Sequence, residues 1–229
     1  MEKKYRTEPD SESGLLRIIA LKDFSNVNKG DRGGLIESEY NLSQEGDCWV
    51  YGKARVLDNA KICENACVYE NAWICGNAEV SERASIYGYA LVSGNAKVSG
   101  FAYVKENAKV YGEAYIYGNA RVQGNAEVYG KASVRGHACI FWNAKVGGHA
   151  LIHGYSKILG NAWIFENAEI YGNAVVYGDA RVSGRVRVHD NAGVCGSAKV
   201  YDDMDICGED IIDEHSIELW FRRLRGYHS

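Results

Sequence analysis

Nine aromatic and basic residues in the middle of the chain have the chemistry to bind a planar anion. Aromatic rings stack on flat rings, and arginine, lysine and histidine donate hydrogen bonds to phosphate oxygens. The set itself contains no carboxylate, so it suits a small anionic, nucleotide-like ligand. The candidate ligand-binding residues are Phe101, Tyr103, Tyr117, Arg121, Arg135, His137, His153, Tyr155 and Lys157.

The sequence offers less for catalysis or for metal binding. His137, His149, His153 and His189 all fall within an unbroken repeat, and a general base needs an orienting partner that a sequence cannot reveal. His149 and His153 are four residues apart, but a zinc site needs further ligands at tetrahedral spacing. The seven cysteines are odd in number and form no CxxC pair. We therefore predict no catalytic residue, no metal site and no cofactor, and we expect reduced, partly buried thiols.

A six-residue repeat carries these candidate residues. Every sixth residue from Val50 to Ile206 is Val or Ile, at all 27 positions, and position five of each hexad is Ala with four exceptions. Position three is usually Gly, and position four is Asn about half the time. Because strand residues alternate between two faces, positions five and one point inward, and positions six and two point outward. The Gly-Asn pair predicts the turn between short strands.

The hexad pattern aliphatic-x-x-Asn-small-x resembles the left-handed β-helix, or hexapeptide-repeat, superfamily over residues 50–211. The stretches 33–36 and 42–51 are also similar to a group of YdcK-like bacterial and phage proteins of that kind. The resemblance implies an all-β fold, a left-handed parallel β-helix with three hexads per coil and about nine coils. The superfamily usually has Gly at position two, whereas this chain has it at position three, which changes the turn but not the fold.

The ends of the array predict two caps. Terminal coils expose strand edges, so repeat arrays need covering segments. We expect an N-terminal cap over residues 1–49, the left-handed β-helix over residues 50–211, and a C-terminal amphipathic helix cap over residues 212–229. The helix is predicted from Asp213 to Arg225, where apolar and charged residues alternate with helical spacing.

One face of the predicted prism favours self-association. Residues 18 apart should stack, and the face that runs from Trp49 to Tyr177 carries only three charges, on Lys105, Arg121 and Lys157. A face this apolar is too large to leave in water. Related prisms are commonly trimers, so we expect a homotrimer with this face in the interface. The candidate residues should converge at the edge of this face within about three coils.

Composition narrows the class of partner and the compartment. The net charge is −4, which argues against general binding of long nucleic acid. No apolar run is long enough to span a membrane, and the first residues lack the apolar core of a signal peptide. We therefore expect a cytoplasmic protein.

Three functions remain open at this stage. The first is a non-catalytic trimeric binding protein that sequesters a nucleotide-derived signalling molecule at an aromatic and basic groove between subunits, as in phage counter-defence. The second is a coenzyme A-dependent acyltransferase, although such enzymes usually interrupt the lattice with a loop that supplies a histidine base, and no loop interrupts residues 50–206. The third is a structural spacer without ligand, in which the candidate residues only pack subunits together.

Overall fold

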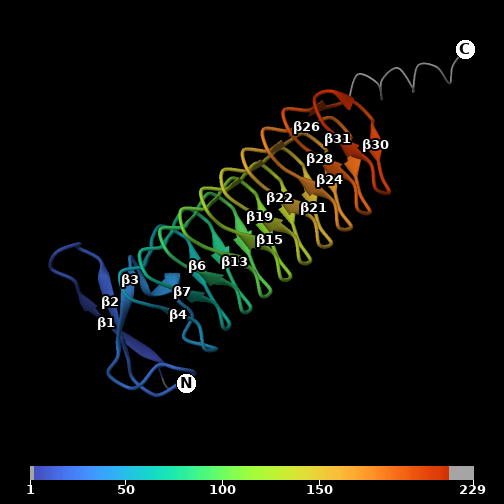
Figure 1. Cartoon of the computed structure of the whole chain (residues 1–229). Helices are drawn as coiled ribbons and strands as arrows, with labels where there is room; N and C mark the ends of the chain where they lie inside the picture. Colours follow the sequence, from blue (N-terminus) through green and yellow to red (C-terminus); the bar gives the residue numbers. More distant parts are fainter. Residues whose placement is uncertain (1–2, 217–229) are drawn as a thin grey trace, which may run out of the picture. The chain divides into compact units, whose positions relative to one another are not determined.

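The computed structural model describes residues 3–216, and the chain divides into two compact units between Asn119 and Ala120. In both units short parallel strands are wound into coils, and unit one also contains three longer strands before its coils (Figure 1). The predicted left-handed parallel β-helix is confirmed, with about ten coils where about nine were expected. Residues 217–229, which hold most of the predicted C-terminal helix, lie outside the described part of the chain.

Unit one begins with an antiparallel meander that leads directly into the coils. Its first elements are β1 (Tyr5–Pro9), β2 (Leu16–Ala20), β3 (Arg32–Ile36) and the 3-10 helix η1 (Glu39–Asn41). Strand β3 pairs antiparallel with β2 and parallel with β5, where Leu35 lies opposite Arg55. Leu42 then forms a parallel bridge with Ile62. Parallel stacking therefore starts inside the segment predicted as a cap, which accounts for the additional coil.

The repeat strands of unit one occupy positions six and one of each hexad. They are β4 (Trp49–Val50), β5 (Arg55–Val56), β6 (Lys61–Ile62), β7 (Cys67–Val68), β8 (Trp73–Ile74), β9 (Glu79–Val80), β10 (Ser85–Ile86), β11 (Leu91–Val92), β12 (Lys97–Val98), β13 (Tyr103–Val104), β14 (Lys109–Val110) and β15 (Tyr115–Ile116). Every third strand pairs in parallel, with Trp49 opposite Cys67 and Cys67 opposite Ser85. Residues 18 apart therefore stack, as the sequence predicts.

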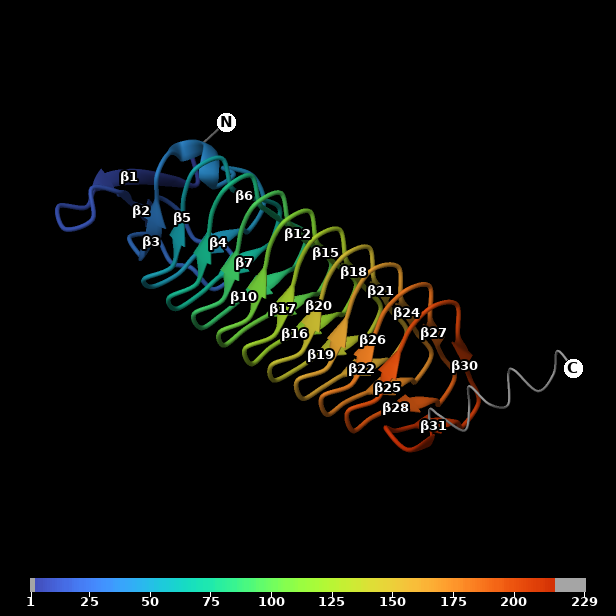
Figure 2. The same ribbon diagram turned by 90° about the horizontal axis from the view of Figure 1, so that it is seen from above.

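Unit two continues the same pattern with β16 to β31 (Figure 2). Its strands are β16 (Arg121–Val122), β17 (Glu127–Val128), β18 (Ser133–Val134), β19 (Cys139–Ile140), β20 (Lys145–Val146), β21 (Leu151–Ile152), β22 (Lys157–Ile158), β23 (Trp163–Ile164), β24 (Glu169–Ile170), β25 (Val175–Val176), β26 (Arg181–Val182), β27 (Arg187–Val188), β28 (Gly193–Val194), β29 (Lys199–Val200), β30 (Asp205–Ile206) and β31 (Ile211–Ile212). Arg121 lies opposite Cys139, and Cys139 lies opposite Lys157.

The core of each unit is a column of branched aliphatic side chains and alanines. All 27 position-one residues are at most 1% exposed, including Val122 and Ile140. Burying each Val or Ile contributes about 1.5–3 kcal/mol, and their β-branched side chains suit the strand conformation. The inward and outward assignment made from the sequence is therefore correct, so the outward positions can be treated as surface.

The turns use position three in the left-handed conformation. Glycine occupies most of these positions, but acidic residues also occur there with positive φ, such as Asp58 at 55° and Glu166 at 60°. The Asp58 carboxylate accepts a hydrogen bond from the Gly76 amide at 2.8 Å, one coil later, and Glu166 accepts one from the Gly184 amide at 2.6 Å. These carboxylates bond a backbone amide of the next coil, so they offset part of their conformational strain.

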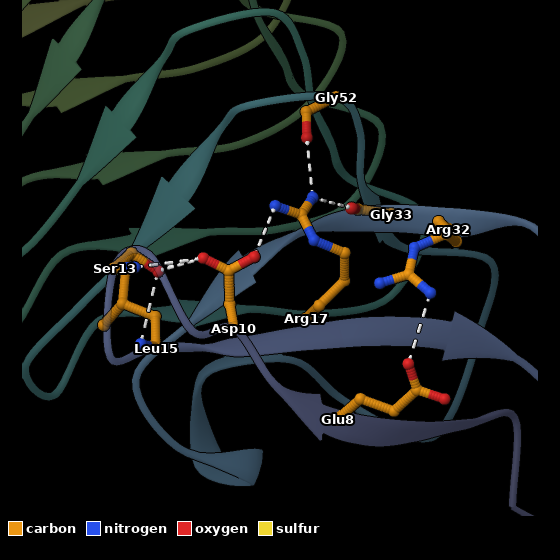
Figure 3. Close-up of polar contacts among 8 residues, drawn as sticks. All are labelled: Glu8, Asp10, Ser13, Leu15, Arg17, Arg32, Gly33 and Gly52. Atoms are coloured by element: carbon orange, nitrogen blue, oxygen red, sulfur yellow. Dashed lines mark hydrogen bonds and ion pairs between the residues drawn. The ribbon is translucent and has the colours of Figure 1, made fainter.

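Arg17 connects the meander to the first coil (Figure 3). Its guanidinium donates to the Gly33 carbonyl at 2.8 Å, to the Gly52 carbonyl at 3.3 Å, and to Asp10 Oδ1 at 3.1 Å. The Ser13 hydroxyl, followed by Arg17, holds the pKa of Asp10 below its usual range. The Arg17 guanidinium thus supplies hydrogen bonds to two backbone carbonyls at the start of the array.

Candidate functional site

The nine predicted site residues divide between the two units. Unit one contains Phe101, Tyr103 and Tyr117, and unit two contains the other six. The two groups are therefore described within their own units.

In unit one the three aromatic residues extend rows of stacked side chains. The Arg83 guanidinium lies 5.6 Å from the Phe101 ring centroid. Tyr103 stacks on Tyr87 with centroids 6.4 Å apart, and Tyr117 stacks on Tyr115 at 4.4 Å. Each ring already has a neighbour, so these residues form an aromatic surface rather than a cavity.

In unit two, two cations flank a thiol on consecutive coils. The outward side chains of β16, β19 and β22 are Arg121, Cys139 and Lys157, which lie in register. Within residues 3–216, neither Arg121 nor Lys157 forms an ion pair, and both are exposed. Unpaired cations about one strand spacing, or roughly 4.8 Å, from a common centre can share an anion.

A pair of parallel rings borders this column. His137 and Tyr155 stand at the corner beside β19 and β22, and their rings stack with centroids 4.8 Å apart and an interplanar angle of 1°. Tyr155 is 61% exposed. His137 lies two residues before Cys139, and Tyr155 lies two residues before Lys157. The ring pair and the cations therefore lie at one edge of one sheet. We call Arg121, His137, Cys139, Tyr155 and Lys157 the cationic site.

The remaining two predicted residues have a different environment. His153 Nε2 lies 3.0 Å from Glu169 Oε1, and its ring stacks on Tyr171 with centroids 5.1 Å apart. The expectation of a cluster without a carboxylate is therefore wrong on this side of the corner. Glu169 lies on β24, which pairs with β21, so its carboxylate reaches the His153 ring from the next coil. Arg135 occupies the same outward position as His153 one coil earlier, and its Nε is buried without a hydrogen-bond partner among the described residues.

The sequence-based prediction missed two residues that matter here. Glu169 supplies the orienting partner that His153 was said to need, and Cys139 occupies the centre of the cationic site. Cys139 could have been found from the 18-residue stacking, because it lies midway between Arg121 and Lys157 in one column. The stacking does not mark Glu169, which is in register with Leu151 and contacts His153 across 16 residues.

The pKa of the Cys139 thiol depends on burial and on the charges of Arg121 and Lys157. Burial raises the pKa of the Cys139 thiol, and the positive charges of Arg121 and then Lys157 act in the opposite direction. The Sγ atom also donates weakly to the His137 carbonyl at 3.4 Å. The thiol is therefore mainly protonated at neutral pH, with a thiolate that the two cations stabilise.

Among residues 3–216, no group of three or more His, Cys, Asp or Glu side chains is arranged to hold a metal ion. No helix within these residues is both long enough and apolar enough to cross a bilayer.

Comparison with known sequences finds a match within the repeat. A family model described as the YdcK Beta solenoid repeat matches residues 114–130. A protein of Escherichia coli (strain K12) called "Uncharacterized acetyltransferase YdcK" is 46% identical over 48 residues. The match spans 20% of this chain and 15% of that protein, so the chain aligns with only a small part of the length of this relative.

Solved structures with similar architecture include two proteins of low sequence identity. LpxA from Acinetobacter baumannii is 12% identical, with 73% of this chain and 77% of that chain covered and a TM-score of 0.39. UDP-N-acetylglucosamine acyltransferase from Campylobacter jejuni is 21% identical, with 66% and 68% covered and a TM-score of 0.30.

Proposed function

Because this chain is a hexapeptide-repeat β-solenoid of the superfamily that its repeat predicts, we propose that its second unit binds a planar anionic ligand of the nucleotide class. The observation that carries the proposal is the cationic site. Arg121 and Lys157 have no acidic partner among the described residues, and the exposed His137–Tyr155 ring pair lies beside them.

The site supports a specific mode of binding. A base would continue the ring stack on the open side of Tyr155, where stacking contributes about 1–3 kcal/mol per base. Phosphate oxygens would lie between the Arg121 guanidinium and the Lys157 ammonium, which give charge-assisted hydrogen bonds. The backbone that carries both groups is a regular lattice, so only the exposed Arg121 and Lys157 side chains need to become ordered on binding.

Acetyl transfer from coenzyme A is the second candidate, and the His153–Glu169 pair favours it. An imidazole held by a carboxylate is the arrangement expected of a general base, which would accept the proton of an acceptor amine or hydroxyl during attack on the thioester. His153, Tyr155 and Lys157 lie within one hexad around a single corner. Coenzyme A carries an adenine nucleotide, so the cationic site would take that part of it.

The experiment is a calorimetric screen of the full chain against AMP, cyclic dinucleotides, cyclic ADP-ribose isomers and coenzyme A. We expect binding of at least one of these and a loss of about tenfold or more when Arg121→Gln and Lys157→Gln are combined. Arg181→Gln is the matched control, because Arg181 lies on another sheet over Trp163. If none of the compounds binds, or if the control weakens binding equally, the proposal is wrong.

Two finer predictions are tested in the same screen. Sequestration of a nucleotide-derived signal in phage counter-defence stays a prediction, and tight binding of a cyclic nucleotide without turnover would support it. Binding of coenzyme A alone, with acetyl transfer that His153→Gln abolishes, would support the acetyltransferase. The predicted homotrimer, with the ligand between subunits, requires a threefold mass by light scattering.

A further inference from the structure

A small groove lies on the surface of unit one. Four residues line a cavity of about 190 Å³, and they come from two consecutive coils: Lys53, Arg55, Asn71 and Trp73. Arg55 and Trp73 lie in register on β5 and β8, and Lys53 and Asn71 occupy the bordering corner. We call this the Trp73 groove.

In the described part of the chain, the polar side chains that line this groove have no hydrogen-bond or ion-pair partner. Within residues 3–216, Lys53 and Arg55 form no ion pair, including with Glu70, the acid beside Asn71 in the sequence. The Asn71 amide makes no side-chain hydrogen bond in the same residues, because its column neighbours are Lys53 and Tyr89 rather than another asparagine. At the next corner, by contrast, Asn77 donates to Asn95 at 2.9 Å.

Trp163, which occupies the same hexad position as Trp73, gives an internal comparison. In unit two, Trp163 Nε1 donates to the Tyr129 hydroxyl at 3.0 Å, and the Arg181 guanidinium lies 5.6 Å from its ring. Trp73 has neither contact and is 46% exposed. The cation beside Trp73 thus faces the groove instead of covering the indole, which leaves a ring face and two cations available together.

The dimensions of the groove select the class of ligand. The strands that carry Arg55 and Trp73 are neighbours, about one strand spacing or roughly 4.8 Å apart, and both side chains line one cavity of about 190 Å³. A ligand that contacts both side chains within this cavity must therefore carry its anionic group close to a single ring. A nucleotide does not fit this spacing, because the ribose separates the base from the phosphate. Asn71 both donates and accepts hydrogen bonds, which matches ring hydroxyls.

We propose that the Trp73 groove binds an anionic monosaccharide unit, such as a uronate or a sugar phosphate. The indole packs on the apolar face of the sugar ring, Arg55 and Lys53 bind the carboxylate or phosphate, and Asn71 bonds a hydroxyl group. For a single sugar in so small a cavity, millimolar affinity is expected.

The test uses the full chain with 5-fluorotryptophan in place of its five tryptophans. Loss of one fluorine resonance in Trp73→Phe assigns the groove, and loss of another in Trp163→Phe assigns the control. Titration with glucuronate and with glucose 6-phosphate should shift the Trp73 resonance and leave the Trp163 resonance unchanged. The two ligands distinguish a carboxylate from a phosphate requirement, and a shift with either supports the proposal.

Binding of the sugar acids should depend on the positive charge of Arg55. Arg55→Gln should weaken binding about tenfold or more, whereas Arg181→Gln should not change it. The proposal is overturned if Trp73 does not respond to either sugar acid, if neutral glucose binds as well as glucuronate, or if AMP binds the groove more tightly than both. A Trp73 resonance that moves on dilution alone would show that a second copy of the chain occupies the groove, which would also overturn it.

Discussion

Cys139 can serve as a reporter of the charges in the cationic site without knowledge of the ligand. The pKa of its thiol is raised by burial, and Arg121 and Lys157 oppose that effect from the coils on either side. If both cations are replaced, in Arg121→Gln with Lys157→Gln, the thiolate loses its stabilisation. We therefore expect the double variant to react more slowly with a thiolate-specific alkylating reagent.

The size of the effect follows from the spacing of the coils. With neighbouring strands about 4.8 Å apart and long side chains that spread outward, each charge lies about 6 Å from the sulfur. At that distance one charge contributes about 0.7 kcal/mol in water, where screening is strongest. Two charges give about 1.4 kcal/mol, or a tenfold lower thiolate fraction. A more basic thiolate is also more nucleophilic, so the observed rate should fall about fourfold.

The measurement is alkylation by iodoacetamide at neutral pH and low salt, with the rate at each cysteine peptide read by mass spectrometry. Each single variant should account for about half of the effect on a logarithmic scale, and added salt should reduce the difference. Cys75 is the internal control, because its raised pKa comes from burial and then from Asp58. An unchanged rate at Cys139 in the double variant would show that the two cations do not face the thiol. Faster alkylation at both Cys139 and Cys75 would indicate unfolding instead, because burial is what raises the pKa of both thiols.

Two further predictions concern the lattice and its first coil. A Cβ at Gly100 would lie 2.6 Å from the Gly118 amide nitrogen and carbonyl oxygen, whereas a Cβ at Gly52 would lie 3.6 Å from its nearest neighbour. Gly100→Ala should therefore lower the free energy of unfolding, measured by denaturant titration, by roughly 1–3 kcal/mol more than Gly52→Ala. Equal losses in the two variants would refute the close stacking of the coils. The lowered pKa of Asp10 means that its contribution to stability is present above the ordinary aspartate pKa of about 4 and is lost as the pH falls through the lower folded value. Asp10→Asn should therefore show a smaller loss of stability below about pH 4 than the parent chain, and an acid profile identical to that of the parent would contradict the stabilising role of the Asp10 carboxylate.

The sequence was sufficient for the interior because every hexad repeats the same physical requirement. A branched aliphatic at position one and alanine at position five leave only one inward face, and period two then fixes the outward positions. The start of the array was harder to predict. Leu35 and Leu42 join the parallel stack without a preceding hexad, so no periodic signal marks them.

The site could be predicted only in part, because outward positions obey no repeat. Stacking at 18 residues correctly brought Arg121, Lys157 and the His137–Tyr155 pair to one edge. It did not reveal which side chains pair with one another. The His153–Glu169 contact depends on side-chain direction across 16 residues, and the sequence gives equal weight to many such neighbours.

The placement of acids in the turns explains why unpaired cations occur on these faces. Position three requires a left-handed backbone, and its amide does not take part in the ladder between coils. A carboxylate one coil earlier can bond that amide, as Glu64 bonds Glu82 at 2.8 Å and Asp190 bonds Gly208 at 3.2 Å. Acids used in this way are directed along the corner rather than across the sheet. Among residues 3–216, the cations at position six of β5, β16 and β22 have no acidic partner, so an anion from outside this part of the chain can neutralise them.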